Sequence, residues 1–531
     1  MFSTEPLGKD LLYTKKEYFI PLFGLVGLGN FLILFNFVLP ISSNILRVII
    51  ISLVLTSIYL YFKNFKFKFK FKFSFFVDYI LIPSILLVST VNINFHYDAG
   101  YYHLLHQSWL RETNLILGMS NIFFAFGMSS IYEYISAFLW TKKSLIYLHF
   151  LNIYFIHFFY LFLKCHILRK NNNFLFATSF FVLTFSILDN FGFDGGRNGY
   201  LFIQGVGKQD ISVGILFFIV TTLSFVMLKN NHKLDINYVY LSLISFFIFE
   251  IKVSGVMVFL LLISNLFKLK FFDQENFKKI LIFNIPVVLL SILWFSKSIL
   301  NTSCIIYPLE LTCFNFFDWY IEDSVVEVEY YTKASSGAYD FQLPFLNWIQ
   351  RILISGNEYR DVILKNFGLS VCLILFLKKL FFKKNNTPAE YKLLGTIFLI
   401  INVLYLIFFG PIPRYAVGAF LIFFTTVALF TGESKIKLNR SISIVLILFS
   451  IASLVNLSSY KSLLTQENIL LIDPRIDNKI NQEIGYVKSF TNWVKPSKGD
   501  QCWVRIDCSM SNEDIYFENT SFFKKAYRVQ K

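Results

Sequence analysis

The topology of the chain depends on residues 237–267, which read NYVYLSLISFFIFEIKVSGVMVFLLLISNLF. This apolar stretch is too long for one membrane-spanning helix of about 20 residues and short for two. The loops on either side, 229–233 and 268–279, are both basic. Basic loops collect on one side of a membrane, so an even number of crossings should separate them. We therefore predict two short helices that meet at Glu250-Ile251-Lys252. The alternative, one long tilted helix, would put the two basic loops on opposite sides.

Apolar stretches recur along nearly the whole chain. Of its 531 residues, 55% are hydrophobic and 16% are charged, whereas a soluble domain is about 45–50% apolar and about 25% charged. We therefore expect an all-α polytopic membrane protein with about thirteen spanning helices. The predicted spans lie near residues 19–40, 45–62, 74–92, 144–164, 174–190, 211–228, 237–250, 253–267, 280–297, 363–378, 391–410, 415–431 and 441–458.

The short loops fix the expected orientation. Lys and Arg gather in cytoplasmic loops, and the basic loops of this chain all fall on one side if the N-terminus is cytoplasmic. The net charge of +15 then needs no nucleic acid, and the lysine run of loop 63–73 is interpreted as a membrane anchor that contacts anionic lipid. We expect an integral membrane protein whose C-terminus lies on the non-cytoplasmic side.

This topology divides the chain into three parts. Residues 1–73 form an N-terminal helix pair with a basic loop, residues 74–458 a membrane core, and residues 459–531 a small outer segment. The core carries two large outer loops, 92–143 and 298–362. We predict that the Gly- and Ser-broken portion 113–140 forms amphipathic helices lying at the membrane interface.

Four of the six cysteines fall in these outer segments. Cys304 and Cys313 lie in one, and Cys502 and Cys508 lie in another. Pairs of cysteines that are close in sequence on an oxidising face predict two small-loop disulfides, and unpaired thiols are the alternative. No His or further Cys flanks either pair, so a zinc site is not expected.

One polar segment directly follows the third predicted span: His96-Tyr97-Asp98-Ala99-Gly100-Tyr101-Tyr102-His103. Asp98 at a helix end near the lipid headgroups is a candidate general base, and the flanking Tyr and His side chains are candidate hydrogen-bond partners. An equally good interpretation is that the Asp98 side chain caps the N-terminus of a new helix.

Three further basic clusters are predicted on the same face. Asp194 to Arg197 enclose a Gly-Gly turn that suits phosphate, although an ordinary loop is the favoured reading. Lys252, at the tip of two short helices, reaches a lipid phosphate, pairs locally with Glu250 or snorkels to the interface. Arg414 and Tyr415 follow two prolines, and they form either a phosphate site or an interfacial anchor. The acidic stretch 318–329 is interpreted as a solvated loop face.

The sequence contains no Gly-Lys-Ser/Thr nucleotide loop, no His-Glu-x-x-His motif and no Cys-x-x-Cys motif. No cofactor is predicted from motifs, and no metal ligands are assigned, although a divalent cation stays open. The absence of a nucleotide loop argues against an ATP-driven pump.

The pattern resembles the GT-C fold glycosyltransferases. The matching elements are Asp98-Ala99-Gly100-Tyr101-Tyr102, Lys252-Val253-Ser254-Gly255 and the segment from Pro411 to Tyr415. Within that group, the chain is similar to a set of bacterial polytopic membrane proteins through Tyr97 to His103, Tyr307-Pro308 and Pro413 to Tyr415. The resemblance covers roughly residues 74–430. The chain departs from the acidic motif of the superfamily at Ala99, where a second Asp or Glu is common, and the motif follows the third span rather than the first.

The resemblance implies a location in the bacterial inner membrane, with a periplasmic C-terminus, and it implies a function. It points to inverting transfer of a sugar from a polyprenyl phosphate to a glycan or lipid acceptor on the outer face. Asp98 would be the base, Lys252 and Arg414 would hold the phosphate, and nearby polar side chains would orient the substrates. The expected binding residues are His96, Tyr101, Tyr102, His103, Asp194, Arg197 and Tyr415. A transporter or flippase of lipid-linked glycans, and an outer-face glycan polymerase, are the alternatives.

Overall fold

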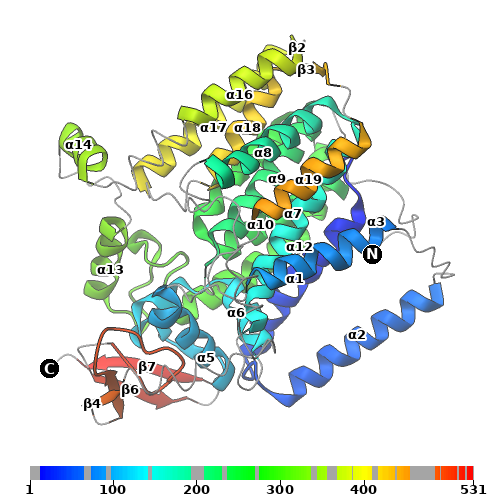
Figure 1. The fold of residues 1–531 in the computed structure, drawn as a ribbon. Helices are drawn as coiled ribbons and strands as arrows, with labels where there is room; N and C mark the ends of the chain where they lie inside the picture. The colour runs from blue at the N-terminus through cyan, green and yellow to red at the C-terminus, as the bar shows by residue number, and fades with distance from the viewer. Residues whose placement is uncertain are drawn as a thin grey trace.

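The structure is a computed structural model that is mostly helical (Figure 1). It describes residues 12–64, 73–90, 97–140, 146–192, 208–229, 236–268, 274–335, 344–355, 368–384, 387–409, 417–436, 439–454, 485–490, 492–510, 514–520 and 523–529.

Each of the predicted apolar stretches is helical over most of its described length. The helices of the N-terminal half are α1 (Lys16–Asn36), α2 (Asn44–Asn64), α3 (Phe73–Phe76), η1 (Val77–Leu81), α4 (Ile82–Val88), η2 (Ala99–His103), α5 (Leu104–Glu112), η3 (Met119–Asn121), η4 (Phe124–Met128), α6 (Ile131–Leu139), η5 (Ile146–Leu148), α7 (His149–Arg169), α8 (Asn173–Gly192), α9 (Asp210–Lys229), α10 (Ile236–Ile251), η7 (Val253–Val258) and α11 (Phe259–Lys268). They are followed by α12 (Gln274–Thr302), η8 (Glu310–Thr312), α13 (Glu322–Ser335), α14 (Phe345–Ser355), α16 (Gly368–Phe381), α17 (Ala389–Phe409), α18 (Val417–Leu429) and α19 (Arg440–Leu454).

Several helices suit a membrane by length and composition. Within the described residues, five are long and apolar enough to cross one, namely α1, α7, α9, α12 and α17. Leu281, Val288, Leu289 and Ile292 of α12 are each more than half exposed. Exposed apolar surface of this kind marks contact with a membrane or with another protein, and together with the five long apolar helices it is consistent with a helical membrane protein.

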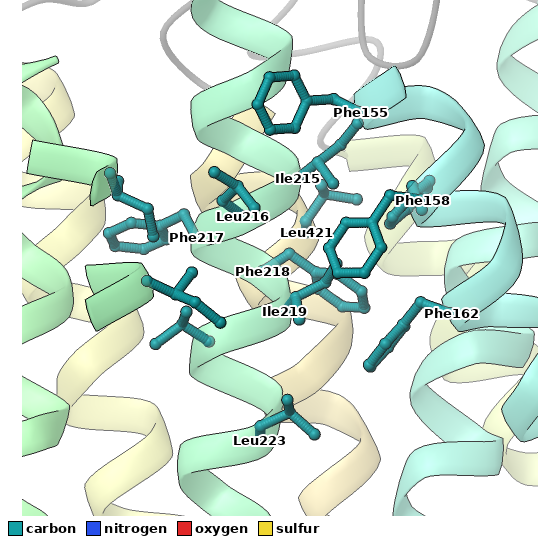
Figure 2. Packing of buried hydrophobic residues seen from close by; sticks show 14 of the residues in the cluster. Phe155, Phe158, Phe162, Ile215, Leu216, Phe217, Phe218, Ile219, Leu223 and Leu421 are labelled. Atoms are coloured by element: carbon teal, nitrogen blue, oxygen red, sulfur yellow. The ribbon is translucent and has the colours of Figure 1, made fainter. Parts of the chain in front are cut away.

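Helix α9 lies at the centre of the bundle. It is apolar on every side, as expected for a fully buried helix, and nearly all of its side chains are buried. Figure 2 shows Phe155, Phe158 and Phe162 of α7 on one side of it and Leu421 of α18 nearby. The Phe162 and Phe218 rings meet edge to face, with centroids 5.9 Å apart.

The chain breaks at Lys252, as predicted. The backbone of Lys252 is extended, with φ of −155°, between α10 and η7. A Cβ on Gly255 would lie 2.4 Å from the Ile248 side chain, so the two segments approach closely after the break. Lys268 Nζ at the end of α11 donates to the Leu228 carbonyl, near the end of α9, at 2.5 Å. The ends of α9 and α11 therefore lie together. Between them, α10 runs away from this end of the bundle, and η7 and α11 return to it.

Other basic loops gather at this same end of the bundle. Thr14, just before α1, hydrogen-bonds His166 near the end of α7 at 3.0 Å. Lys170 Nζ donates to the Ile436 carbonyl. Strands β2 (Phe382–Lys384) and β3 (Thr431–Ser434) pair antiparallel beyond α16 and α18. The alternation of helix directions inferred from the basic loops is therefore present in the bundle.

The C-terminal segment forms strands, a feature that was not predicted. Strands β6 (Asp514–Asn519) and β7 (Lys524–Val529) make an antiparallel hairpin, and β1 (Ile116–Leu117) pairs parallel with β7. Strands β4 (Tyr486–Phe490) and β5 (Trp493–Pro496) form a second pair. In Figure 1 the strands lie with α5 beyond one end of the bundle. They form a cap on loop 97–140, and we call described residues 485–529 the C-terminal cap.

The portion 113–140 differs from the prediction of surface-lying amphipathic helices. It contains strand β1, two short 3-10 turns and one α-helix, α6. Residues Ile131 to Ala137 of α6 are buried, and α6 packs on α1 and α5. Its charged residue, Glu133, bonds to side chains of η2, α5 and the residue before α9, so the helix is enclosed by protein.

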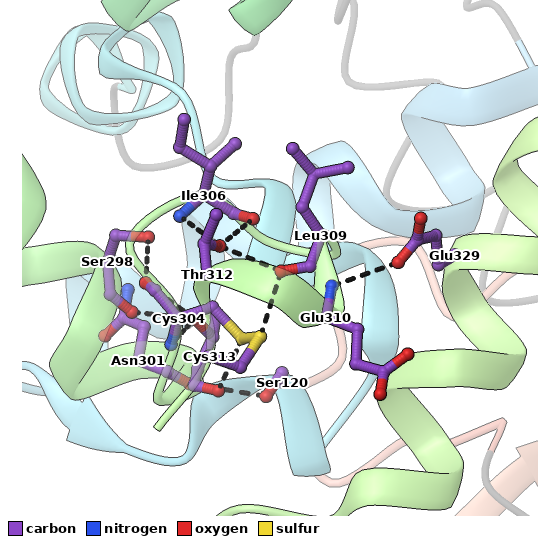
Figure 3. The surroundings of a disulfide bond; sticks show 11 residues. Ser120, Ser298, Asn301, Cys304, Ile306, Leu309, Glu310, Thr312, Cys313 and Glu329 are labelled. Atoms are coloured by element: carbon purple, nitrogen blue, oxygen red, sulfur yellow. Dashed lines mark hydrogen bonds between the residues drawn. A yellow bond between two sulfur atoms is a disulfide. The ribbon is translucent and has the colours of Figure 1, made fainter. Parts of the chain in front are cut away.

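Both predicted disulfides are present, Cys304–Cys313 and Cys502–Cys508. The first closes the turn after α12, shown in Figure 3. Around it, Ser298 Oγ donates to the Cys304 carbonyl at 2.9 Å, and Thr312 Oγ1 donates to the Ile306 carbonyl at 2.9 Å. Cys165 and Cys372 form no disulfide.

The contact between α9 and α18 gives a first testable prediction. A Cβ on Gly214 would lie 2.5 Å from the Val417 side chain, whereas a Cβ on Gly418 would meet Phe217 at an ordinary 3.5 Å. Gly214→Ala should therefore destabilise the fold by about 1–3 kcal/mol through overpacking. Gly418→Ala should be neutral or stabilising by about 0.5–1 kcal/mol, because alanine favours helix. Thermal unfolding in detergent checks both, and equal shifts for the two variants would contradict this account of the packing.

Candidate functional site

Asp98 lies at the end of the bundle that carries the C-terminal cap. It immediately precedes the π-helical turn η2, and its side chain makes no helix-capping hydrogen bond. The carboxylate instead forms an ion pair with the Lys208 ammonium. Lys208 is 6% exposed. The capping reading of Asp98 is therefore wrong, and the acid belongs to a tertiary polar cluster.

The first residues of α9 and those just before it join three parts of the chain. Lys208 pairs with Asp98, Gln209 Nε2 donates to Glu133 Oε1 at 3.2 Å, and Asp210 Oδ1 accepts from Lys252 Nζ at 2.5 Å. Asp98 and Lys252, which are far apart in sequence, thus bind residues two positions apart. Their two Asp–Lys pairs flank Gln209, and Lys252 is a paired residue rather than a snorkelling one.

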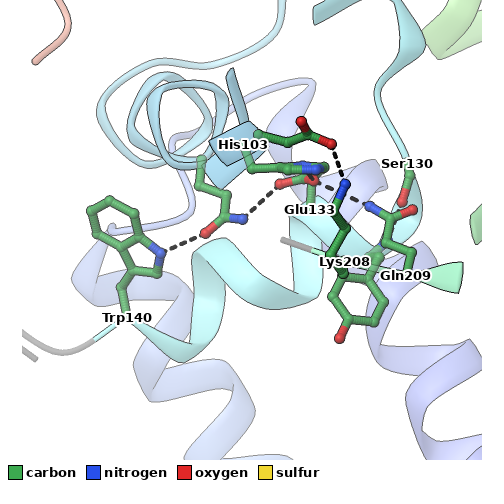
Figure 4. Close-up of polar contacts among 9 residues, drawn as sticks. His103, Ser130, Glu133, Trp140, Lys208 and Gln209 are labelled. Carbon is green, nitrogen blue, oxygen red and sulfur yellow. Dashed lines mark hydrogen bonds and ion pairs between the residues drawn. The ribbon is translucent and has the colours of Figure 1, made fainter. Parts of the chain in front are cut away.

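Glu133 is the centre of a buried hydrogen-bond network, shown in Figure 4. It is 3% exposed. Its carboxylate accepts from His103 and, at 2.6 Å, from Gln107 Nε2. The Gln107 amide oxygen in turn accepts from Trp140 Nε1 at 2.7 Å. The network holds η2, α5, α6 and the residue before α9 in one arrangement.

The Glu133 carboxyl is held in its charged form by its partners. Burial alone would raise its pKa, but the His103 imidazole and the hydrogen bonds from His103 and Gln107 outweigh burial and lower the pKa below its ordinary value. A buried carboxylate with this many donors is rigid. Its position is therefore set by the fold.

The tyrosines predicted to bind substrate lie around this cluster. Tyr101 stacks on Tyr97 with ring centroids 5.5 Å apart, and it meets Phe123 edge to face at 5.1 Å. The Tyr102 ring lies 4.0 Å from the His103 ring. Tyr97 is half exposed, whereas His103 is buried. His103 is thus a supporting residue behind the exposed face of the segment.

His106 gives a second prediction. It stacks on Phe126 at 5.2 Å, and its Nε2 has no hydrogen-bond partner among the described residues. Burial lowers the pKa of His106 from 6.5 to about 4. Between these values the unfolded chain binds a proton that the folded chain does not, so stability falls as the pH falls below 6.5, by roughly 1.4 kcal/mol per pH unit.

The test is thermal unfolding between pH 6.5 and pH 5, a window above the ordinary range of carboxyls. The unfolding temperature of the wild type should decrease on acidification. His106→Phe and His106→Gln cannot titrate there, and both should show a flatter dependence. A slope unchanged in both variants would show that another group is responsible.

Several predicted site residues lie outside the described residues: His96, Asp194, Arg197, Arg414 and Tyr415. Val417 follows Arg414 by three positions, and its side chain contacts Gly214 in the second turn of α9. The acidic stretch is described. Glu322, Asp323, Glu327 and Glu329 lie on α13, and Asp318 pairs with Lys525 of the C-terminal cap.

Four residues of the network were not predicted: Gln107, Glu133, Trp140 and Gln209. One signal in the sequence pointed to Glu133, because it is the only charged residue in the apolar run IYEYISAFL of residues 131–139. Amides and indoles give no such signal. No group of three or more His, Cys, Asp or Glu side chains within the described part of the chain is arranged to hold a metal ion.

The fold and the site together define a helical bundle with helices that could cross a membrane and a buried polar network at one end. A family model, described as a domain of unknown function (DUF8201), matches residues 8–421. The chain belongs to this family. No curated protein and no solved structure matches the chain. The matched region contains Asp98, Lys208, Asp210 and Lys252 and ends before the C-terminal cap.

Proposed function

We propose that the protein is a GT-C-like glycosyltransferase that moves a sugar from a polyprenyl phosphate to a glycan or lipid acceptor. In this proposal about thirteen helices cross the bacterial inner membrane, the N-terminus is cytoplasmic, and the network around residues 208–210 faces the periplasm. One observation carries the proposal. Asp98 and Lys252 bind side chains that are two positions apart, so an acidic residue and a basic residue that are distant in the sequence share one site.

The chemistry is a single displacement with inversion. The acceptor hydroxyl oxygen attacks the anomeric carbon while the bond from that carbon to the phosphate oxygen breaks. The hydroxyl proton passes to the Asp98 carboxylate, and polyprenyl phosphate leaves with the electron pair. A base in this role must be ionised and within hydrogen-bond reach of the acceptor. The ion pair with Lys208 stabilises the charged carboxylate before the acceptor arrives.

Lysines at the site suit the leaving group. Negative charge grows on the phosphate in the transition state, and a fixed ammonium stabilises it. The Lys252 side chain is 29% exposed while its partner Asp210 is 5% exposed, so Lys252 is the more accessible member of the pair. Arg414 would add a bidentate phosphate contact. Tyr101 and Tyr102 would orient the acceptor.

The test uses purified protein in liposomes with a synthetic polyprenyl-phosphate hexose and short glycan acceptors. The proposal expects a glycosylated product with inverted anomeric configuration. Absence of transfer with every donor and acceptor pair tried, from protein that is folded, would count against it.

A transporter of lipid-linked glycans is the second candidate, and one observation favours it. Glu250 and Lys297 are both buried within bundle helices, and ionisable groups inside a membrane often mark a transport path. Glu250 accepts from Asn30 Nδ2 at 3.2 Å, and Lys297 Nζ donates to the Ser129 carbonyl at 2.7 Å, just before α6. Lys297 thereby fixes the segment that carries Glu133, which suits a structural role. Protein-dependent movement of a fluorescent lipid-linked glycan across liposomes, without sugar transfer, would favour the transporter.

A further inference from the structure

The C-terminal cap contacts the segment that carries Asp98. Trp503 donates its backbone N–H to the Gly100 carbonyl at 2.9 Å. The Gln501 side-chain amide donates to the Tyr97 carbonyl at 2.9 Å, and the Tyr97 hydroxyl bonds the Asp500 carboxylate. Residues 500–503 thus bind the backbone and side chains on both sides of Asp98, although some 400 positions separate them.

The tightest contact is between Trp503 and Gly100. A Cβ on Gly100 would lie 2.7 Å from the Trp503 indole ring, so only glycine lets the ring approach the helical turn this closely. Trp503 and Val504 also pack with Ala99, Leu104 and Leu148. The indole therefore fits between the η2 turn and the start of α7.

The disulfide Cys502–Cys508 holds this loop in shape. Both half-cystines are fully buried, and the backbone of Trp503, inside the disulfide loop, has φ of +55°. A side-chain-bearing residue adopts this left-handed conformation only when its surroundings impose it. The covalent loop and the contact with Gly100 are the surroundings that do so here.

We propose that the C-terminal cap completes the site, and that Trp503 is a positioning residue that fixes the turn carrying Asp98. The family match ends at residue 421, so the matched region alone does not contain this element. The inference about the turn stands on the contacts above. Its consequence for catalysis rests on the proposed function.

The first test is hydrogen–deuterium exchange on the full chain in lipid nanodiscs. In Trp503→Ala, amides of residues 97–104 should exchange about tenfold faster than in the wild type, because the turn opens more often. The amides of α9 should not change. Trp348→Ala is the matched control, because Trp348 stacks on Phe408 of α17, away from this contact. Unchanged exchange at residues 97–104 would overturn the proposal.

The disulfides give a second comparison with its own control. Cys502→Ser/Cys508→Ser should accelerate exchange at residues 97–104, whereas Cys304→Ser/Cys313→Ser removes the other disulfide and should leave this segment protected. Equal effects of the two double variants on residues 97–104 would mean that general loosening, and not the Trp503 loop, is responsible.

A mutant cycle isolates the contact itself. Gly100→Ala alone should push the indole away and accelerate exchange in the same segment. Added to Trp503→Ala, it should have little further effect, because the ring that it displaces is gone. Gly27→Ala, with nothing within 4 Å of the new Cβ, is the matched control. Additive effects of the Gly100 and Trp503 changes would refute the contact as the coupling element.

Transfer kinetics link the cap to catalysis. A displaced base lowers turnover but not donor binding, so Trp503→Ala should reduce kcat about 10- to 100-fold while KM for the polyprenyl-phosphate donor is unchanged. If the wild type transfers no sugar, the proposed function fails while the exchange result still decides the role of the cap. If Trp503→Ala loosens the turn and kcat is unchanged, the positioning role in catalysis is wrong.

Discussion

Asp98→Asn is expected to lower sugar transfer by about 100- to 10,000-fold, the range that a general base contributes. The substitution keeps the shape of the side chain and removes its ability to accept the acceptor proton. Lys252 is untouched, so KM for the donor should change little while kcat falls. The measurement is the initial rate of product formation in liposomes at saturating donor.

Asp98→Asn also removes the carboxylate that pairs with Lys208, which is almost fully buried. Removing one partner of a buried ion pair destabilises a fold by about 3–5 kcal/mol, so activity must be compared at matched folded protein. Asp98→Asn/Lys208→Met removes both charges and should regain stability but not transfer. Glu433→Gln, in the exposed pair with Lys383 on β2 and β3, is the control and should keep full activity. Wild-type rates in folded Asp98→Asn protein would remove Asp98 from the mechanism.

Hydropathy and charge predicted the membrane bundle well, because both are local properties of the sequence. The apolar stretches are helical, and the two basic loops around residues 237–267 required the break that occurs at Lys252. The two disulfides followed from the spacing of their cysteines. In each case, neighbours in the sequence supply the physical constraint.

The arrangement of the site was less predictable, because distant residues determine it. Asp98 was a candidate base from its position after a span, but its pairing with Lys208 depends on how α9 packs. The portion 113–140 was expected at the membrane surface because it is apolar but broken by Gly and Ser, and because the next predicted span already returns the chain to a basic loop. Glu133 explains why this segment is enclosed in the structure. Its carboxylate accepts hydrogen bonds from donors on α5, η2 and the residue before α9. In the C-terminal cap, β4–β5 and β6–β7 pair between near neighbours and were not recognised, whereas the pairing of β7 with residues 116–117, about 400 positions earlier, has no local signal in the sequence.

Glu133→Ala is expected to have the largest effect on stability. Its carboxylate accepts hydrogen bonds from His103, Gln107 and Gln209 in a buried site. Without it these donors are left inside the protein with no acceptor, which costs about 3–5 kcal/mol in total. Thermal and denaturant unfolding measure the loss. Glu112→Ala, at the exposed end of α5, is the matched control and should be nearly neutral.

Acidification separates Glu133 from His106, which is another buried titratable group of the loop. The pKa of Glu133 is lowered in the folded state, so its stabilisation is complete above the ordinary carboxyl value of about 4.5 and is lost only as the pH falls through the lower folded value. Between pH 6.5 and 5 the stability difference between wild type and Glu133→Ala should therefore not shrink, whereas the difference from His106→Gln changes with pH. A stability difference between wild type and Glu133→Ala that shrinks over that window would mean that the Glu133 carboxyl takes up a proton in the folded state. The conclusion that its partners hold this carboxyl in its charged form would then be wrong.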